Sequence, residues 1–407
     1  MGNSNQLKSR KPIRVAMIGG GVNSAVGRVH EIAMRMDLEF ALTAGCFSRD
    51  PEFNQQSGQA YGVPSTRVYR HPEHMLQDPG LDVDAVVIAT PISSHAEYIQ
   101  LALDQGLRVI SDKPLVGTLA ECQQILQRTP AHSTDVFCIF NYTGYPAVRE
   151  MKQRIENGEL GQVFKIMVEM PQDSYMRLKN ANKTQAIQPW RLQDGVISCV
   201  SLDLFVHLHS LVNYVTGKTP QRVHAWQRAI SGVAEGLIDE VDALIEYSDN
   251  LRVNAWYGKA ALGQRNGLRL RVLGTQGSLE WVQEQPEQLR AADARGNTLI
   301  YDRISTSSSV TTEARYNRFK AGHPAGFIEA FANYYTDIAQ AMRSGQLNAH
   351  TLGLGVAAEG LAVCHAIAES ARLGQTVDVP TLGTAYEHRD RATDPLHHST
   401  QSPVQTG

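Results

Sequence analysis

The stretch that most constrains this chain is a short apolar run that leads directly into three glycines. Residues Ile13 to Ile18 have the almost continuous apolar pattern of a buried parallel strand, and positions 19 to 21 are all glycine. A helical pattern, Ala25–Met36, begins shortly afterwards. Glycines at such a turn let the backbone approach a pyrophosphate, which then lies at the positive end of the helix. We expect four residues of this turn to bind a dinucleotide: Gly19, Gly21, Val22 and Asn23.

The glycine spacing departs from the six-residue dinucleotide fingerprint. The third position of the fingerprint holds Ser24, and the next glycine is Gly27. The motif is therefore imperfect, or lengthened by a few residues, and a plain glycine turn without a ligand is the alternative. The organisation of the following residues favours the dinucleotide-binding interpretation.

Strand and helix patterns alternate through the first third of the chain. The expected strands are Ile13–Ile18, Phe40–Phe47, Ala85–Ala89, Leu107–Ile110 and Val136–Phe140. The expected helices between them are Ala25–Met36, Pro51–Tyr61, Ser94–Gln105 and Thr118–Gln127. Such alternation is typical of a doubly wound parallel sheet, which binds its ligands at the carboxyl ends of the strands.

After about Phe140, strand patterns follow one another with little helix between them. The expected strands are Gln162–Met170, Arg222–Arg228, Ala243–Tyr247, Arg252–Trp256, Leu268–Leu273 and Ser278–Trp281. The expected helices are Tyr145–Asn157, Asp203–Val215, Pro324–Arg343 and Thr351–Arg372, whereas Asp173–Gln188 is a polar stretch and Ile304–Ala314 reads as a loop. We therefore predict an α/β chain in four parts. They are a flexible N-terminus (1–11), a Rossmann dinucleotide-binding domain (12–141), an α+β domain with an open, mostly antiparallel sheet (142–385) and a disordered tail (386–407).

Composition narrows the range of partners. The formal net charge of −3 creates no basic field for nucleic acid or an anionic membrane. No apolar run reaches the roughly 18 residues that a membrane span needs. The five cysteines are scattered and form no Cys-x-x-Cys motif, so we expect neither a zinc site nor a disulfide framework. The composition predicts a cytoplasmic protein without a metal, a nucleic-acid partner or a membrane.

Polar residues follow the second and third expected strands. Ser48 and Arg49 occupy the place where NAD enzymes carry an acidic residue, so Arg49 favours the 2′-phosphate of NADP over NAD. A helix-capping serine beside a solvated arginine is the alternative. Thr90, Pro91 and His95 lie where the nicotinamide half of a cofactor is expected, although a lone histidine is as readily structural.

Lys113 and the pair Asp203 and His207 are the candidate catalytic groups. Pro114 restricts Lys113 to an extended conformation, so Lys113 projects from the carboxyl edge of the sheet toward the presumed cofactor. Asp203 and His207 are four residues apart on one expected helix and share a face. The alternatives are a solvated surface lysine and an aspartate that only complements the helix dipole.

Taken together, these motifs resemble the glucose–fructose oxidoreductase, inositol dehydrogenase and rhizopine-catabolism (Gfo/Idh/MocA) family. The resemblance covers about residues 13–378 and is carried by the Asp203/His207 pair and by the segments IGGGVNSAVG, ATPISSH, SDKPL, FNYTGYP and GHPAGFIEAFANYY. It implies a Rossmann domain followed by an α/β domain whose open sheet makes homodimers or homotetramers. It also implies reversible oxidation of a hydroxyl of a sugar, inositol or related polyol, with NADP or NAD as cofactor.

The resemblance also implies roles for individual residues. Lys113 matches the catalytic lysine of the family, and Asp203 and His207 match its Asp-x-x-x-His pair. A secondary hydroxyl is a weak acid, so His207 would take its proton while Lys113 hydrogen-bonds the same oxygen. Asp203 would orient His207 or bind a neighbouring hydroxyl. Five further residues are expected to contact substrate, with core or rim packing as the alternative: Tyr142, Tyr145, Trp190, Arg191 and His323.

Two positions at the helix start depart from the family pattern, and Asp112 in place of the usual glutamate is a milder change. Leu202 and Phe205 stand where glycines normally let substrate and nicotinamide approach the backbone. We expect Phe205 either to fill part of the substrate pocket or to point into the core. Two alternative functions follow from the same resemblance, a redox-silent regulator that binds the dinucleotide and a glycosidase that keeps NAD bound.

Overall fold

The computed structural model describes residues 11–382 of the 407-residue chain. The flexible N-terminus and the disordered tail that the sequence predicts fall on residues 1–10 and 383–407, apart from Lys11, and so lie outside the described residues.

Five parallel strands form the first sheet, here called sheet A. They are β1 (Ile13–Gly19), β2 (Phe40–Cys46), β3 (Ala85–Ala89), β4 (Arg108–Ser111) and β5 (Val136–Cys138), arranged in the order β2-β1-β3-β4-β5. Every residue of β3 is buried, as its continuous apolar sequence predicts. The helices between these strands are α1 (Ala25–Met36), α2 (Pro51–Ala60), α3 (Pro72–Leu76), α4 (His95–Asp104) and α5 (Leu119–Arg128). The strand order changes direction at β1, which places the binding crevice of such a sheet at the carboxyl ends of β1 and β3.

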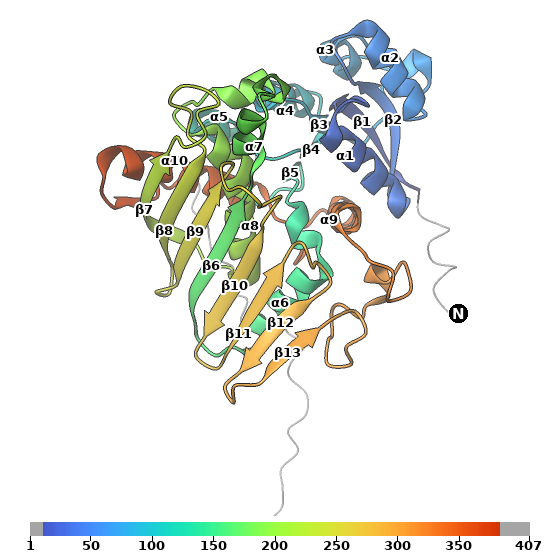
Figure 1. The fold of residues 1–407 in the computed structure, drawn as a ribbon. Coiled ribbons are helices and arrows are strands. Elements are labelled where there is room, and N and C mark those ends of the chain that lie inside the picture. The colour runs from blue at the N-terminus through green and yellow to red at the C-terminus, as the bar shows by residue number, and fades with distance from the viewer. Residues whose placement is uncertain (1–10, 383–407) are drawn as a thin grey trace, which may run out of the picture.

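Nine strands form a second, broad layer, here called sheet B (Figure 1). In spatial order they are β13 (Thr298–Tyr301), β12 (Leu289–Asp293), β11 (Gly277–Val282), β10 (Arg269–Gly274), β6 (Val163–Pro171), β9 (Arg252–Gly258), β8 (Glu240–Tyr247), β7 (Pro220–Arg228) and β14 (Val377–Asp378). All neighbouring pairs are antiparallel except β6 and β9. The predicted fold class, a Rossmann sheet plus an open and mostly antiparallel sheet, is confirmed.

Helices of the second domain cover one face of sheet B. They are α6 (Pro146–Glu156), α8 (Val206–Thr216) and α10 (Leu354–Leu373), and within residues 11–382 no helix covers the opposite face of the sheet (Figure 1). By length and composition α10 is apolar enough to cross a membrane, but 72% of its apolar window is buried inside the fold, as in the core helix of a globular protein. The remaining long helix, α9 (Phe327–Ser344), packs against α1 and so joins the two halves of the chain.

Several short elements differ from the sequence prediction. The polar stretch after Asp173 contains α7 (Ser174–Asn180), whose first turn is held by hydrogen bonds from the backbone to the carbonyl of Lys259. Strands β12 to β14 were also missed, because they are short and β13 has no buried residue to give it an alternating pattern. Short 3₁₀ turns occur at Ser65–Arg67, Ile92–Ser94, Asn141–Gly144, Thr184–Ala186, Pro189–Leu192 and Ala314–Tyr316.

Candidate active site

The glycine turn after β1 has the backbone that a dinucleotide site needs. Gly19 has a φ of +75°, and a Cβ there would lie 2.7 Å from the carbonyl oxygen of Ala89 on the neighbouring strand. A Cβ on Gly27 would lie only 2.2 Å from the carbonyl oxygen of Gly20. Gly27 therefore supplies the close helix-to-strand contact that the third glycine of the fingerprint usually makes. The motif is lengthened rather than broken, and these residues fit a pyrophosphate at the start of α1.

Side chains within and beside this turn satisfy its backbone N–H groups. The Oγ of Ser24 caps α1 by accepting a hydrogen bond from the backbone N–H of Gly27, at 3.2 Å. The N–H of Val22 donates to Ser57 on α2, at 3.2 Å, while Asn23 is exposed. The predicted cofactor residues Gly19, Gly21, Val22 and Asn23 thus lie on one turn, and their contacts with a cofactor stay a prediction.

The end of β2 leaves Arg49 available to a ligand. Asp50, not Ser48, caps α2, because its carboxylate accepts a hydrogen bond from the N–H of Phe53 at 2.8 Å. The Oγ of Ser48 accepts from the N–H of Asp50 at 3.1 Å. Arg49 is exposed and forms no hydrogen bond or ion pair with any other residue in the range 11–382.

His95 ties two loops of sheet A together. Its side chain is buried, and its ring nitrogens face the carbonyl oxygens of Pro114 and Thr90, each at 2.9 Å. The hydroxyl of Thr90 accepts a hydrogen bond from Ser94, whose hydroxyl also contacts the carbonyl of Pro91. This geometry gives His95 a structural role between the loops after β3 and β4, and a cofactor contact of its ring gains no support from it.

Three cations converge on the carboxylate of Asp203. The Nζ of Lys113 lies 2.9 Å from Oδ1 of Asp203 and also donates to its carbonyl oxygen at 2.6 Å. The other carboxylate oxygen, Oδ2, accepts from Arg191 at 2.6 Å and lies 2.8 Å from the Nζ of Lys259. Burial alone would raise the pKa of Asp203, but the positive charges of Lys113, Lys259 and Arg191 outweigh it and hold this pKa well below its usual value. Asp203 is therefore an anion that anchors Lys113.

Asp203 lies on a π-helical turn rather than on the α-helix that the sequence predicts. Ser201–Phe205 has π-helical hydrogen bonding and leads directly into α8. Such turns recur at functional sites because they widen one turn of a helix. The ring of Phe205 is 1% exposed and packs 5.5 Å from the ring of Tyr257, and Leu202 is also buried. Phe205 thus points into the core, and the pocket is not filled by it.

His207 is a buried, neutral imidazole. Burial and, to a lesser degree, the positive charge of Lys113 lower its pKa well below the usual value. Its Nδ1 is buried and has no hydrogen-bond partner among residues 11–382. The ring of Tyr142 meets the imidazole edge-on, with the ring centroids 4.6 Å apart. A neutral imidazole at this position can accept a proton.

The candidate groups share one pocket of about 160 Å³ below the carboxyl edge of sheet A. Its polar lining residues are Asp112, Lys113, Asn141, Tyr142, Gln172, Asp203, His207 and Asn266, and its apolar ones are Val26, Met170, Leu204, Phe327 and Phe331. The three predicted catalytic residues and one predicted substrate residue, Tyr142, are therefore brought together. Arg191 joins them through its ion pair with Asp203 and stacks over the ring of Trp190, 4.3 Å from its centroid.

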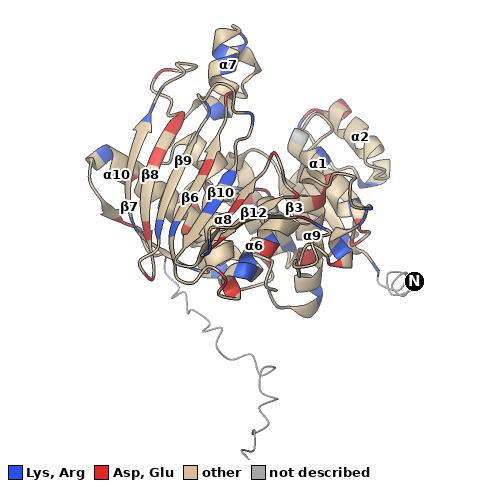
Figure 2. Cartoon of the chain, turned by 60° about the horizontal axis from the view of Figure 1, so that its bottom comes forward, with Lys and Arg blue, Asp and Glu red and all other residues tan. Residues whose placement is uncertain are grey.

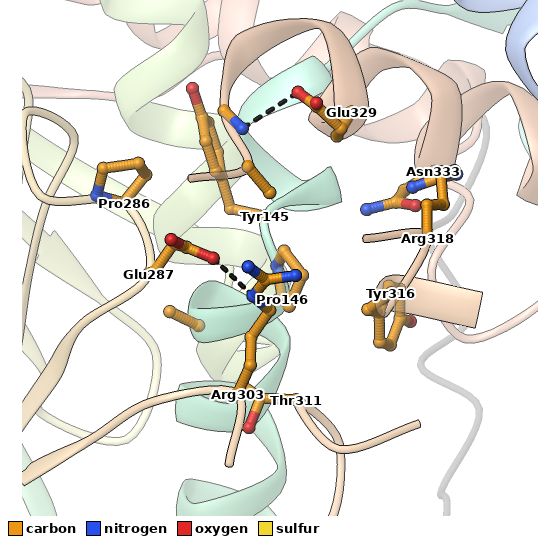
Figure 3. Close-up of a pocket in the computed structure, with 13 residues that line it drawn as sticks. Tyr145, Pro146, Pro286, Glu287, Arg303, Thr311, Tyr316, Arg318, Glu329 and Asn333 are labelled. Carbon is orange, nitrogen blue, oxygen red and sulfur yellow. Dashed lines mark hydrogen bonds and ion pairs between the residues drawn. The ribbon is translucent and has the colours of Figure 1, made fainter. Parts of the chain in front are cut away.

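Two predicted substrate residues lie elsewhere. Tyr145 lines a separate pocket together with Pro286 and Asn333, beside an ion pair between Glu287 and Arg303 (Figure 3). The side chain of His323 is exposed, and the hydrogen bonds of this residue come from its backbone: its N–H donates to the carbonyl of Lys320 and its carbonyl accepts from Arg303. Sequence adjacency to the family segments FNYTGYP and GHPAG predicts these residues in the site, but neither lines the pocket that contains Lys113 and His207.

Sequence reasoning missed Lys259, Gln172 and Asn266. Gln172 and Lys259 directly follow β6 and β9, the one parallel pair of sheet B, and so emerge at the same edge of that sheet. Polar residues just beyond parallel strand ends are the signal that could have found them. Asn266 lies in a loop before β10, and nothing in the sequence marks it.

Family models match both halves of the chain. The model described as "Oxidoreductase family, NAD-binding Rossmann fold" matches residues 13–140, and the "GFO/IDH/MocA C-terminal domain" model matches residues 148–280. The chain therefore belongs to the Gfo/Idh/MocA family of oxidoreductases, as the sequence motifs predict.

Individual relatives have low sequence identity to this chain but match most of its length. An uncharacterized oxidoreductase of Bacillus subtilis, YfiI, is 28% identical over 82% of this chain and 86% of its own length. The levoglucosan dehydrogenase of Pseudarthrobacter phenanthrenivorans is 25% identical over 71% of this chain and 80% of its own. Among solved structures, an inositol dehydrogenase homologue of Azotobacter vinelandii in complex with NADH and myo-inositol superposes with a TM-score of 0.81. It is 28% identical, and the match covers 90% of this chain and 98% of that one.

Proposed function

We propose that this protein transfers a hydride between a nicotinamide cofactor and a carbon of a sugar, an inositol or a related polyol, interconverting a secondary alcohol and a ketone. The observation that carries the proposal is the single pocket shared by Lys113, Asp203 and His207. Similarity to an inositol dehydrogenase homologue and to a levoglucosan dehydrogenase supports a cyclic, hydroxyl-rich substrate.

The residues of the pocket suit proton transfer at a hydroxyl oxygen. When bound, the nicotinamide supplies the hydride acceptor or donor. The turn after β1 and the start of α1 would hold its pyrophosphate. The neutral imidazole of His207 takes the proton of a substrate hydroxyl or returns it to a ketone. The ammonium of Lys113, anchored by Asp203, donates a hydrogen bond to the same oxygen and stabilises its developing negative charge.

We also propose NADP as the preferred cofactor. The exposed and unpaired guanidinium of Arg49 stands beyond the end of β2, where a 2′-phosphate would need a planar set of donors. No acidic residue occupies the places of Ser48 or Arg49, and the carboxylate of Asp50 is engaged in capping α2.

We also propose that the protein forms a homo-oligomer and is located in the cytoplasm. The helix-free face of sheet B carries apolar side chains beside charges of both signs, which suits a second copy of the same face. All five cysteines are free and buried, which is consistent with a reducing compartment.

The test is a screen for nicotinamide absorbance changes with inositols, aldoses, anhydrosugars and their ketones, run with NAD⁺ and with NADP⁺. We expect turnover of at least one polyol, with a higher kcat/KM for NADP⁺ that falls selectively in Arg49→Ala. Lys113→Met should lower kcat by about 100- to 10 000-fold and leave the cofactor Kd near that of the wild type.

Two outcomes would contradict the proposal. Undiminished kcat in Lys113→Met would remove this lysine from the chemistry. Tight cofactor binding without turnover of any polyol would favour the redox-silent regulator, and glycoside cleavage without net reduction of the cofactor would favour the glycosidase.

A further inference from the structure

We propose that Lys259 is a positioning residue of this active site. Its buried ammonium contacts the carboxylate of Asp203 on one side and, on the other, the first of two hydrogen-bonded amide side chains, Gln172 and Asn266, that line the pocket. The inference rests on the proposed function and specifies how that site would recognise a polyol.

Lys259 is held firmly in place. It follows the last residue of β9, its N–H donates to the carbonyl of Asp239 at 2.8 Å, and its own carbonyl accepts from the N–H of Tyr175 at 2.9 Å. Its side chain is 7% exposed, and its Nζ contacts Oδ2 of Asp203 at 2.8 Å and Oε1 of Gln172 at 3.0 Å. A buried ammonium needs such partners, because an unpaired one would be strongly destabilising.

The ammonium sets the direction of a hydrogen-bond chain. Because an ammonium only donates, Gln172 must turn its oxygen toward Lys259, so its amide nitrogen faces Asn266 and donates to Oδ1 at 2.6 Å. The amide nitrogen of Asn266 then donates to the hydroxyl of Tyr142 at 3.1 Å and to the side-chain oxygen of Gln283. Each amide in the row is thereby locked in one of its two orientations.

This row faces the substrate side of the pocket. Gln172, Asn266 and Tyr142 all line the cavity that also contains Lys113 and His207. With the bonds above in place, Gln172 retains one N–H and Asn266 retains one acceptor lone pair for a ligand. A substrate with several hydroxyls would therefore meet a fixed pattern of donors and acceptors rather than adaptable amides.

Lys259 also restrains the carboxylate that anchors Lys113. Oδ2 of Asp203 is held by Lys259 and Arg191, which leaves Oδ1 for Lys113. Loss of Lys259 would remove one of these two charged contacts on Oδ2 and free Gln172 to rotate.

The charged or titratable groups that face Asp203 are Lys113, Arg191, Lys259, Cys199, His207, Tyr142 and Tyr175. Three of these are cations, so removing one should raise the pKa of Asp203.

The experiment compares Lys259→Met and Lys259→Arg with the wild type, using the full chain and the polyol that the screen identifies. We expect Lys259→Met to raise KM for the polyol about 10- to 100-fold, as for a lost charged hydrogen bond, with a smaller fall in kcat. The acid limb of the kcat/KM profile should move to higher pH, and the cofactor Kd should not change. Lys259→Arg should restore the acid limb but not KM, because a guanidinium keeps the charge without the geometry.

A matched control and a second readout keep the inference separable from the proposed function. Lys218→Met removes a half-buried lysine, paired with Asp249 beyond the end of α8, and should behave as the wild type. Crystal structures of cofactor-bound wild type and Lys259→Met should show Gln172 and Asp203 rotated in the variant. Unmoved side chains would overturn the inference even if no polyol is turned over, and so would a wild-type KM and pH profile in Lys259→Met.

Discussion

At the scale of single residues, burial and charge act differently on the two members of the Asp203/His207 pair. Both side chains are buried. The carboxylate of Asp203 has three cations within hydrogen-bonding distance, whereas Nδ1 of His207 has no hydrogen-bond partner among residues 11–382. The pKa of Asp203 is lowered by the charges, whereas that of His207 is lowered first by burial. The pair therefore holds an anion and a neutral base side by side.

The lowered pKa of His207 predicts a specific dependence of stability on pH. Below about pH 6.5 the unfolded chain binds a proton at this histidine that the folded chain does not, so stability falls as the pH falls. Between about pH 6.5 and 5 the free energy of unfolding of the wild type should decrease more steeply than that of His207→Asn, by up to about 1.4 kcal/mol per pH unit.

Urea unfolding at a series of pH values measures this difference. His350, whose pKa is lowered to about 3 mainly by burial, is present in both proteins and cancels. Parallel slopes for wild type and His207→Asn would show that the folded protein binds this proton as readily as the unfolded chain.

At the scale of elements, the contact between β1 and α1 decides the shape of the cofactor turn. The predicted strand and helix were both correct, yet the sequence alone did not show which residue brings them together. Gly27 does so, one helical turn later than the fingerprint predicts, because the turn contains additional residues. A spacing rule counts residues, whereas close packing depends on where the helix axis crosses the strand.

Gly27→Ala tests this contact. Alanine favours a helix by about 1 kcal/mol over glycine, but here its Cβ would overlap the backbone of Gly20, so we expect a net loss of stability of about 1 to 3 kcal/mol. Cofactor affinity should fall as well, because α1 must move away from the turn. Gly117→Ala, where a Cβ would make its nearest contact at 3.4 Å, is the control for both measurements. A stabilised Gly27→Ala protein with unchanged affinity would disprove the role of this glycine.

At the scale of the whole molecule, polar contacts join α1 of the first domain to the second domain. His30 on α1 contacts the hydroxyl of Tyr335 on α9 at 2.6 Å and lies 3.5 Å from Asp112 at the end of β4. Arg318 forms a two-pronged ion pair with Asp37, just after α1. The contacts to Tyr335 and Arg318 hold α1 against α9 and the segment that precedes it.

The helix-free face of sheet B predicts self-association. Trp226 and Leu244 are 50% and 46% exposed on this face, on adjacent strands β7 and β8. Lys and Arg are interspersed with Asp and Glu over the strands of the sheet (Figure 2).

Light scattering should give a mass that is a multiple of 44.8 kDa, and the double variant Trp226→Glu with Leu244→Glu should return it to 44.8 kDa. Ile304→Glu, at an exposed apolar position in a loop, is the control. A wild-type mass of 44.8 kDa at micromolar concentration would contradict the prediction.

By itself, the sequence determined the two sheets, most of their helices, and the identity of Lys113, Asp203 and His207 as candidates. These depend on local periodicity, on residues at strand ends and on motif spacing, and each of these signals is contained in a short segment of the sequence. Only the tertiary structure decided that Phe205 turns into the core, that Tyr145 and His323 lie outside the pocket, that Asn266 lines it and that Lys259 pairs with Asp203. Those outcomes depend on which distant segments meet and on which way each side chain faces, and packing between elements sets both.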